Sequence, residues 1–252
     1  MQVFSSIKDL TKNKNTILTL GTFDGIHPGH LKIIDKLVSC SKEKGCRNVV
    51  ITFHPHPRTV LGNDNSVKML TTQEEKIYLL RKHGVENLLT INFTKEFASL
   101  TAEEFIYGYL INGIGLSEIV LGHDHHFGKG RSGNVELLKM IGAKENFIVT
   151  TADPFLIDDE VVSSTKIRNA ISHGDVAKAN KLLGRNYSFG GVVVSGDKRG
   201  RELGFPTANI KLSSQEKLLP ASGIYAVKFF VGNENHIGLL SIGYRPTFYN
   251  EG

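Results

Sequence analysis

The segment from Gly21 to His30, G-T-F-D-G-I-H-P-G-H, contains two histidines three residues apart. It follows a short apolar run and precedes apolar residues at helical spacing, so it spans the start of a helix. Pro28 suits an early helical position, and His27 and His30 would face the same way. Because a helix N-terminus attracts anions, the pattern predicts a cradle for a triphosphate, in which two imidazoles stabilise the charge that develops during phosphoryl displacement. The alternative is a glycine-rich turn with two incidental histidines.

Another phosphate-binding candidate is the sequence S-S-T-K-I-R at residues 163–168. Ser163 or Ser164 can cap a helix that starts here, and Arg168 lies one turn inside it. Hydroxyl groups, free backbone N–H groups and a guanidinium suit a phosphate. The same residues are also compatible with an ordinary helix start.

Further histidines raise the question of a metal site. Residues 51–57 read I-T-F-H-P-H-P, where His54 and His56 could be metal ligands or part of an extended loop set by the prolines. Residues 122–133 read G-H-D-H-H-F-G-K-G-R-S-G. If that segment is extended, its residues alternate between two faces, and neither face holds three ligands. A dedicated zinc site is therefore not expected.

The first two-thirds of the chain alternates between strand and helix patterns. Strands are expected at residues 17–21, 48–53, 88–93, 118–122 and 147–150. Helices are expected after His30, at 73–83, from the capping box at Thr101 to about Leu110, and at 134–142. Such alternation predicts a Rossmann-like α/β domain with a parallel sheet covered by helices.

The C-terminal part has a different character. Residues 164–183 have a helical pattern broken at Gly174-Asp175, and glycine and β-branched residues increase after Gly184. This change predicts a domain boundary near residue 183, with domains at 1–183 and 184–252. The second domain is expected to be a small antiparallel barrel or sandwich.

The second domain contains its own candidate site, G-D-K-R-G-R-E-L-G-F-P-T-A-N-I at residues 196–210. Thr207 and Asn209 offer hard oxygen ligands of the kind that Mg²⁺ accepts. A polar hairpin connection is the alternative. Both interpretations are compatible with the residues alone.

Composition limits the function classes. The chain has 252 residues, a formal net charge of +5 and 40% hydrophobic residues, and it contains no apolar run long enough for a membrane span. No run of five or six basic residues occurs. This favours an enzyme that binds anionic nucleotides over a protein that binds nucleic acid. The N-terminus lacks the pattern of a secretory signal, so a cytoplasmic protein is expected. The two cysteines are expected to be free thiols.

Taken together, the motifs resemble the bacterial bifunctional riboflavin kinase and FAD synthetase family, within the nucleotidyltransferase superfamily. Three motifs carry the resemblance in the first domain: G-x-F-D-G-x-H-x-G-H, T-F-x-P-H-P and S-S-T-x-I-R. It implies that His27, His30 and Arg168 are catalytic, with both histidines contacting ATP phosphates. It further implies that nucleotide is bound by Gly21, Phe23, Asp24, Gly25, Gly29, Ser163, Ser164 and Thr165.

The resemblance also implies a flavin site and a kinase site. The family pattern G-x-D-F-x-F-G-x-x-R-x-G matches residues 122–133 and implies flavin binding by Asp124, His125, Phe127 and Arg131, with His125 standing where an aromatic residue is usual. The kinase pattern G-x-x-x-G-R-x-L-G-F-P-T-A-N implies an ATP and Mg²⁺ site with Gly200, Arg201, Thr207 and Asn209, of which Thr207 and Asn209 hold the metal. The match breaks off before the family's catalytic glutamate, since Glu251 comes too early, so a kinase domain with an incomplete barrel and little FMN production is expected.

The implied activity is transfer of AMP from ATP to FMN, which gives FAD and pyrophosphate without a covalent enzyme intermediate. The substrates and partners are thus ATP, FMN and riboflavin, and a homo-oligomer is compatible with the sequence. One alternative is a nucleotidyltransferase for another phosphate ester, against which residues 122–133 and the kinase-like tail argue. The other is a non-catalytic flavin-binding regulatory protein, against which the intact His27, His30 and Arg168 argue.

Overall fold

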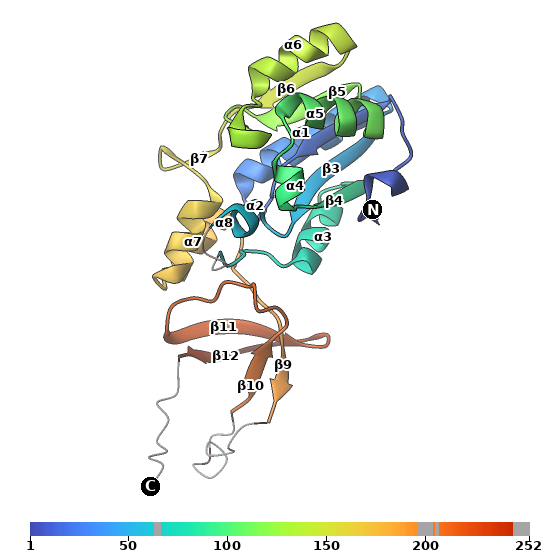
Figure 1. Ribbon diagram of the computed structural model, residues 1–252. Helices are drawn as coiled ribbons and strands as arrows, with labels where there is room; N and C mark the ends of the chain where they lie inside the picture. The colour runs from blue at the N-terminus through green and yellow to red at the C-terminus, as the bar shows by residue number, and fades with distance from the viewer. Residues whose placement is uncertain (63–66, 196–203, 205–206, 244–252) are drawn as a thin grey trace. The chain divides into compact units, whose positions relative to one another are not determined.

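A computed structural model describes residues 1–62, 67–195, 204 and 207–243 of the chain. The chain divides into two compact units, Met1–Val162 and Ser163–Gly252 (Figure 1). Within the described residues, no helix combines the length and apolar character needed to cross a membrane.

The N-terminal unit is built on a six-stranded sheet in the order β1-β4-β3-β2-β5-β6, and every neighbouring pair is parallel. The strands are β1 (Gln2–Phe4), β2 (Thr16–Leu20), β3 (Arg47–His54), β4 (Asn87–Asn92), β5 (Glu118–Gly122) and β6 (Ile148–Ala152). The predicted parallel sheet is confirmed. The short edge strand β1 was not predicted, because three residues are too few to show a periodicity.

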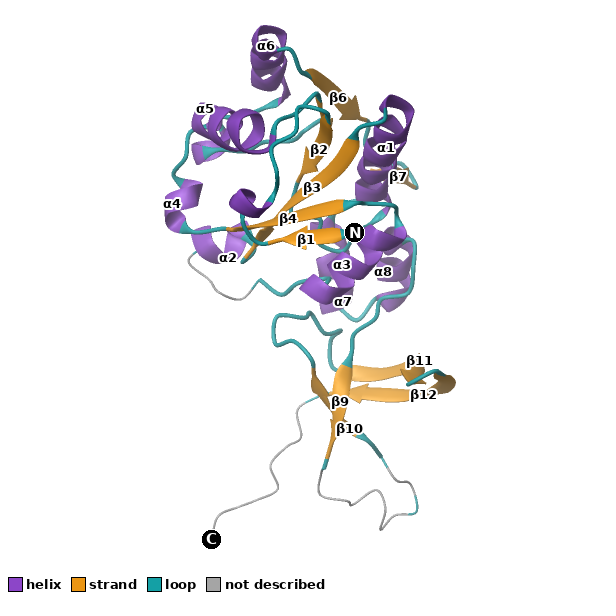
Figure 2. Cartoon of the chain, turned by 90° about the vertical axis from the view of Figure 1, so that its right-hand side faces the viewer, coloured by secondary structure: helices purple, strands orange, loops and turns teal. Residues whose placement is uncertain are grey.

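Helices cover both faces of this sheet, as Figure 2 shows, with α1 and α3 on one side and α4, α5 and α6 on the other. The bounds are α1 (Pro28–Lys44), α3 (Gln73–Lys82), α4 (Lys95–Ala98), α5 (Ala102–Phe105), the π-helix η2 (Ile106–Ile114) and α6 (Val135–Glu145). Alternate strand residues enter two cores: Ile17 and Val50 pack with α1 and α3, whereas Leu18 and Ile51 pack with α5, η2 and α6. The strand order reverses between β2 and β5, and ligands of such sheets bind at the carboxyl ends of the strands beside this point.

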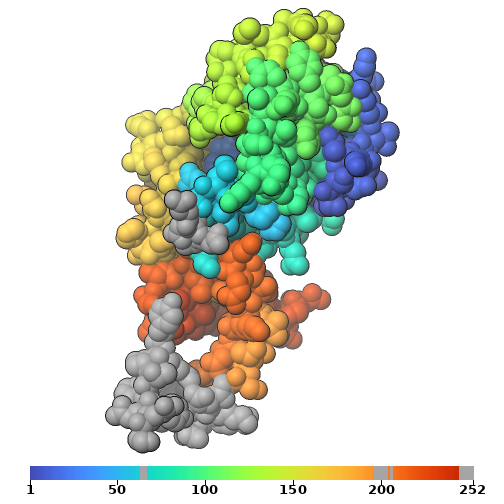
Figure 3. Space-filling view, viewed as in Figure 1, coloured from blue at the N-terminus to red at the C-terminus, as the bar shows by residue number. Residues whose placement is uncertain are grey.

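Shorter elements surround the carboxyl edge of the sheet. They are α2 (Pro57–Leu61), the 3-10 helices η1 (Ile7–Asp9) and η3 (Lys129–Arg131), and a hairpin of β7 (Leu156–Ile157) and β8 (Glu160–Val161). On the surface, α2 (cyan) lies against α4 (green) (Figure 3). The segment after β3 is therefore next to the segment after β4.

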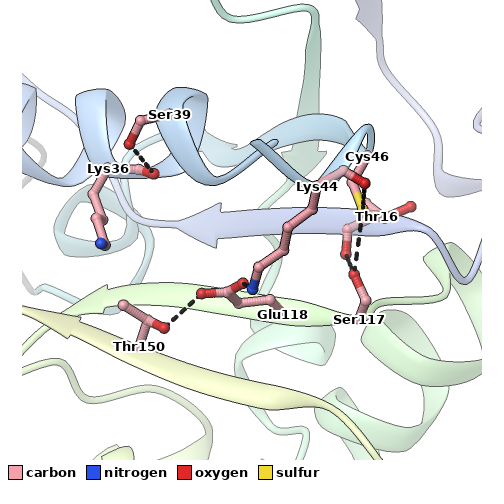
Figure 4. Close-up of polar contacts among 8 residues, drawn as sticks. All are labelled: Thr16, Lys36, Ser39, Lys44, Cys46, Ser117, Glu118 and Thr150. Carbon is pink, nitrogen blue, oxygen red and sulfur yellow. Dashed lines mark hydrogen bonds and ion pairs between the residues drawn. The ribbon is translucent and has the colours of Figure 1, made fainter. Parts of the chain in front are cut away.

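At the opposite, amino end of the strands, a buried carboxylate joins α1 to the sheet (Figure 4). Glu118, the first residue of β5, accepts hydrogen bonds from the Lys44 ammonium and from the Thr150 hydroxyl of β6. The Glu118 side chain is 3% exposed and that of Lys44 is 43% exposed. The hydrogen bond that Lys44 donates to Glu118 raises the pKa of Lys44. Cys40 and Cys46 are free thiols.

The C-terminal unit begins with two helices, α7 (Ser164–Ser172) and α8 (Val176–Leu183), separated at Gly174-Asp175 as predicted. Two antiparallel pairs follow: β9 (Gly191–Val194) with β10 (Asn209–Leu212), and β11 (Gly223–Val231) with β12 (Glu234–Ile242). The predicted antiparallel strands are present, but the described residues form separate pairs and no barrel. The Ala221 N–H donates to the Ile171 carbonyl, so the residues before β11 contact the end of α7 within this unit.

Candidate active site

The paired histidines lie at the start of α1, beside the point where the strand order reverses. His27 is the N-cap residue, and its Nδ1 accepts a 3.4 Å hydrogen bond from the His30 backbone N–H. Pro28 occupies the first turn, as predicted. The two imidazole rings stack with their centroids 3.7 Å apart and 20° between their planes. The structure thus places both rings together at the positive end of the helix dipole.

The loop that leads to these histidines has an unusual backbone. Phe23 (φ 46°), Gly25 (φ 87°) and Ile26 (φ 38°) all have positive φ, which costs a residue with a side chain about 1–2 kcal/mol. The Phe23 ring is buried and meets the His30 ring edge-on at 5.3 Å between centroids. The loop therefore stores strain next to the histidine pair, and Phe23 supports His30.

Two of the predicted nucleotide ligands, Phe23 and Asp24, are only 2% and 1% exposed, respectively. The Asp24 carboxylate accepts hydrogen bonds from the backbone N–H groups of Leu70 and Thr71 and from the Thr71 hydroxyl, at 3.0–3.1 Å. These contacts were not predicted from the sequence. The side chains of Phe23 and Asp24 shape the loop from inside.

Gly29 lies where a side chain would disturb His27. A Cβ at this position would be 3.1 Å from both Cε1 and Nδ1 of the His27 ring. We expect Gly29→Ala to tilt this ring and to lower kcat for FAD formation by about tenfold to a hundredfold, the scale of a misplaced catalytic group. Gly108→Ala is the matched control, since a Cβ there would meet no described atom within 4 Å. Steady-state kinetics with unchanged kcat for Gly29→Ala would contradict the close approach.

The predicted flavin segment after β5 combines the partly buried His125 with several exposed polar side chains. His123 and Asp124 are largely exposed, with 3.9 Å between His123 Nδ1 and Asp124 Oδ1. His125 Nε2 is buried and finds no hydrogen-bond partner among the described residues. Burial lowers the pKa of His125 to about 4, so its imidazole is neutral at physiological pH. The predicted flavin ligand Arg131 is exposed and has φ 60°.

An aromatic cluster connects this segment to the one that follows β3. His125 stacks near Phe127 with centroids 6.1 Å apart, and Phe127 lies 5.8 Å from Phe105. The ring centroid of Phe97 lies 5.9 Å from that of Phe105 and 6.0 Å from that of Phe53. Aromatic side chains in such arrangements attract one another and offer faces to a planar ring. The cluster thus links I-T-F-H-P-H-P to G-H-D-H-H-F-G through a chain of ring contacts, which the sequence alone did not predict.

The environment of the His125 imidazole leads to a prediction about the stability of the folded protein. His125→Phe removes an unpartnered polar atom and is expected to raise the free energy of unfolding by about 1 kcal/mol at pH 7. Because the folded-state pKa of His125 is about 4 and lies below the usual histidine pKa of 6.5, wild-type stability falls as the pH drops below 6.5. The phenylalanine variant should lose this part of the acid sensitivity in urea denaturation at pH 6.5 and 5. Equal pH slopes for both proteins would show that His125 is not held neutral.

The remaining predicted site residues lie in the C-terminal unit. Ser163 caps α7, since its side chain accepts a hydrogen bond from Lys166 N at 3.4 Å, and Ser164, Thr165 and Arg168 occupy the first turns. This helix start was predicted. Of the kinase residues, Thr207 is exposed and Asn209, at the start of β10, is half-buried. Gly200 and Arg201 lie outside the described residues.

A doubly wound parallel sheet, with paired histidines at the first helix after its central strand, defines a nucleotide-binding enzyme of the α/β class. The family model for FAD synthetase matches residues 9–166, and the model for riboflavin kinase matches residues 183–252. The chain belongs to the family of bifunctional riboflavin kinase/FMN adenylyltransferases.

Curated relatives carry both names. The bifunctional riboflavin kinase/FMN adenylyltransferase of Listeria monocytogenes is 40% identical, over 94% of this chain and 75% of its own length. That of Escherichia coli K12 is 34% identical, over 98% of this chain and 79% of its own. A crystal structure described as a macrolide-efflux protein from Streptococcus pneumoniae superposes with a TM-score of 0.88 at 32% identity, covering 98% of this chain and 80% of that one.

Proposed function

We propose that the stacked His27–His30 pair is the centre at which this chain transfers AMP from ATP to FMN. A phosphate oxygen of FMN attacks the α-phosphorus, a new P–O bond forms, and the bond to the bridging oxygen breaks. The electron pair of that bond leaves with pyrophosphate. The attacking oxygen carries no proton when the FMN phosphate is ionised, so a general base is not needed. The observation that supports this role is the joint position of both rings at the N-terminus of α1.

The other predicted site residues have matching roles in this proposal. The backbone near Gly21, Gly25 and Gly29 and the free N–H groups of α1 receive the triphosphate. Both imidazoles donate hydrogen bonds to its oxygens as charge develops. Ser163, Ser164, Thr165 and Arg168 supply hydroxyls, a second helix N-terminus and a guanidinium for the leaving pyrophosphate. Phe23 and Asp24 act through the shape of the loop.

The aromatic cluster supports the flavin half of the proposal. An isoalloxazine ring is planar, and Phe127 and the neutral His125 offer planar groups for it. Asp124 and Arg131 are exposed and can hydrogen-bond the polar parts of FMN. Because His125 Nε2 has no partner among the described residues, bound flavin would also satisfy a buried polar atom.

The C-terminal part is proposed to be a riboflavin kinase module. Its strands would belong to an antiparallel barrel that begins near residue 184, and 1–183 would be the adenylyltransferase domain. Thr207 and Asn209 fit Mg²⁺ because their hydroxyl and amide oxygens are hard ligands and neither side chain is fully buried. When bound, Mg²⁺ neutralises phosphate charge, and Gly200 and Arg201 would contact the same nucleotide. In this proposal the protein acts in the cytoplasm on nucleotides and flavins, not on nucleic acid, and a homo-oligomer is compatible with it.

The test is direct. The chain is incubated with ATP, Mg²⁺ and FMN, and FAD and pyrophosphate are quantified by chromatography and a coupled assay. Formation of both in equal amounts is expected. Turnover of phosphopantetheine or glycerol phosphate instead would support the alternative nucleotidyltransferase, and flavin binding without product would support a regulatory protein.

A further inference from the structure

A buried lysine lies beneath the loop that carries the histidines. Lys76 of α3 is 6% exposed, and its Nζ donates hydrogen bonds to the Thr22 carbonyl at 2.8 Å and to the Thr52 hydroxyl at 3.2 Å. The Thr52 hydroxyl donates to the same Thr22 carbonyl at 3.2 Å. One ammonium group thus joins α3, the end of β3 and the first residues of the loop.

The other side of the loop is held by the residues that precede α3. Asp24 accepts hydrogen bonds from the Leu70 and Thr71 N–H groups and from the Thr71 hydroxyl, and the Gly25 N–H donates to that hydroxyl at 3.1 Å. A capping box between Thr72 and Glu75 fixes the start of α3 immediately afterwards. Both groups of contacts therefore come from a single continuous stretch, residues 70–76.

The loop needs such support because of its backbone. Phe23 and Ile26 hold positive φ without being glycine, and strained residues of this kind persist when the surrounding structure over-determines them. The next residue after Ile26 is His27, so a loop that relaxed would turn the imidazole away. Burial lowers the pKa of Lys76 to about 8, and Asp24 opposes this shift, so the ammonium remains charged at neutral pH.

We propose that residues 70–76, through Lys76 and Thr71, form a clamp that holds the loop at 22–26 in its strained form and thereby positions His27 and His30 for adenylyl transfer. This proposal rests on the proposed function of the histidine pair. Lys76 is a positioning residue in it, since the ammonium acts on the imidazoles through the loop.

A positioning role differs from a purely structural one in what a substitution changes. Replacing a buried charge with an apolar side chain of similar length often leaves stability unchanged or raises it. A clamp, by contrast, affects the step in which the histidines contact the transition state more than it affects ATP binding. Activity and stability should therefore separate in variants of Lys76.

The first experiment compares Lys76→Met with Lys82→Met, an exposed lysine on the same helix. Lys76→Met is expected to lower kcat by about tenfold or more, with KM for ATP changed less than about threefold and Tm lowered by no more than a few degrees. Lys82→Met should match the wild type. A kcat for Lys76→Met within about twofold of an active wild type would overturn the proposal. A loss of kcat that matches a smaller folded fraction of the variant would also overturn it.

A second variant and a second measurement cover the case in which Lys76→Met does not fold. Thr71→Val keeps both buried charges but removes the hydroxyl shared by Asp24 and Gly25, and the same kcat loss is expected. The imidazole NMR signals of His27 and His30 should shift in this variant and stay in place in Lys82→Met. Unshifted signals in Thr71→Val would refute the clamp. Absence of FAD formation by the wild type would instead refute the proposed function, while the NMR comparison still tests the clamp.

Discussion

His30→Ala is expected to lower kcat for FAD formation by about a hundredfold or more, the usual effect of removing one transition-state hydrogen-bond donor. His30 suits this test because the N-cap hydrogen bond of α1 does not use its side chain. The hydrogen bond to His27 Nδ1 comes from the backbone N–H of residue 30, which alanine retains. His27→Ala would be less clear, since it also removes the N-cap side chain of α1.

Steady-state kinetics at saturating FMN, together with thermal unfolding, provides the measurement. His83→Ala is the matched control, because this histidine lies at the end of α3 next to Asp35, on the surface. It should retain the wild-type rate. If His30→Ala worked within about twofold of the wild type, the assignment of the histidine pair as the reaction centre would be wrong.

The architecture of the N-terminal unit follows from its sequence for a physical reason. Interior strands of a parallel sheet are buried on both faces, so Ile17, Val50 and Ile119 belong to continuous apolar runs that are easy to recognise. The helices are marked by caps such as the box at Thr101, although helix α5 continues as a π-helix from Ile106. No local pattern predicts that change of hydrogen bonding.

The candidate site was only partly predictable. The position of His27 and His30 follows from a strand, glycines and a proline within one short segment. The partners of Asp24 and Thr22 lie 30 to 54 residues away along the chain, and local spacing does not encode such contacts. A signal did exist for Lys76, which lies four residues before the buried Leu80 and so on the inward face of α3. A lysine in that position indicates a buried polar partner.

The barrel expected for the C-terminal part illustrates a different limit. Glycine and β-branched residues after Gly184 predicted short strands, and β9, β11 and β12 are present there, whereas β10 was not predicted. Closure of a barrel depends on contacts between strand pairs that lie far apart in sequence, and periodicity does not determine them. The described residues accordingly support antiparallel pairing, while the barrel itself stays a prediction.

Removal of the Lys44 ammonium is expected to lower the free energy of unfolding of the N-terminal unit by about 2–4 kcal/mol, somewhat less than for a fully buried pair because Lys44 is 43% exposed. Lys44→Met leaves the Glu118 carboxylate buried, with Thr150 as its remaining partner among the contacts in Figure 4. Glu118→Gln keeps the volume and removes the buried charge, so it should cost less, about 1–2 kcal/mol. The double variant should recover much of the loss, because it contains no isolated charge.

Urea denaturation at pH 7 measures the free energy of unfolding of the two single variants and the double variant. The raised pKa of Lys44 means that its stabilising effect is fully present below its usual pKa of 10.5 and is lost as the pH rises through the folded-state value, so pH 7 reports the whole pair. FAD formation at 25 °C should remain at the wild-type level, since Glu118 begins β5 and the histidines lie at the carboxyl edge of the sheet. A Glu118→Gln variant less stable than Lys44→Met would indicate that the carboxylate stabilises the fold without its lysine partner. That outcome would locate the stabilisation in the hydrogen bond between β5 and β6 rather than in the anchoring of α1.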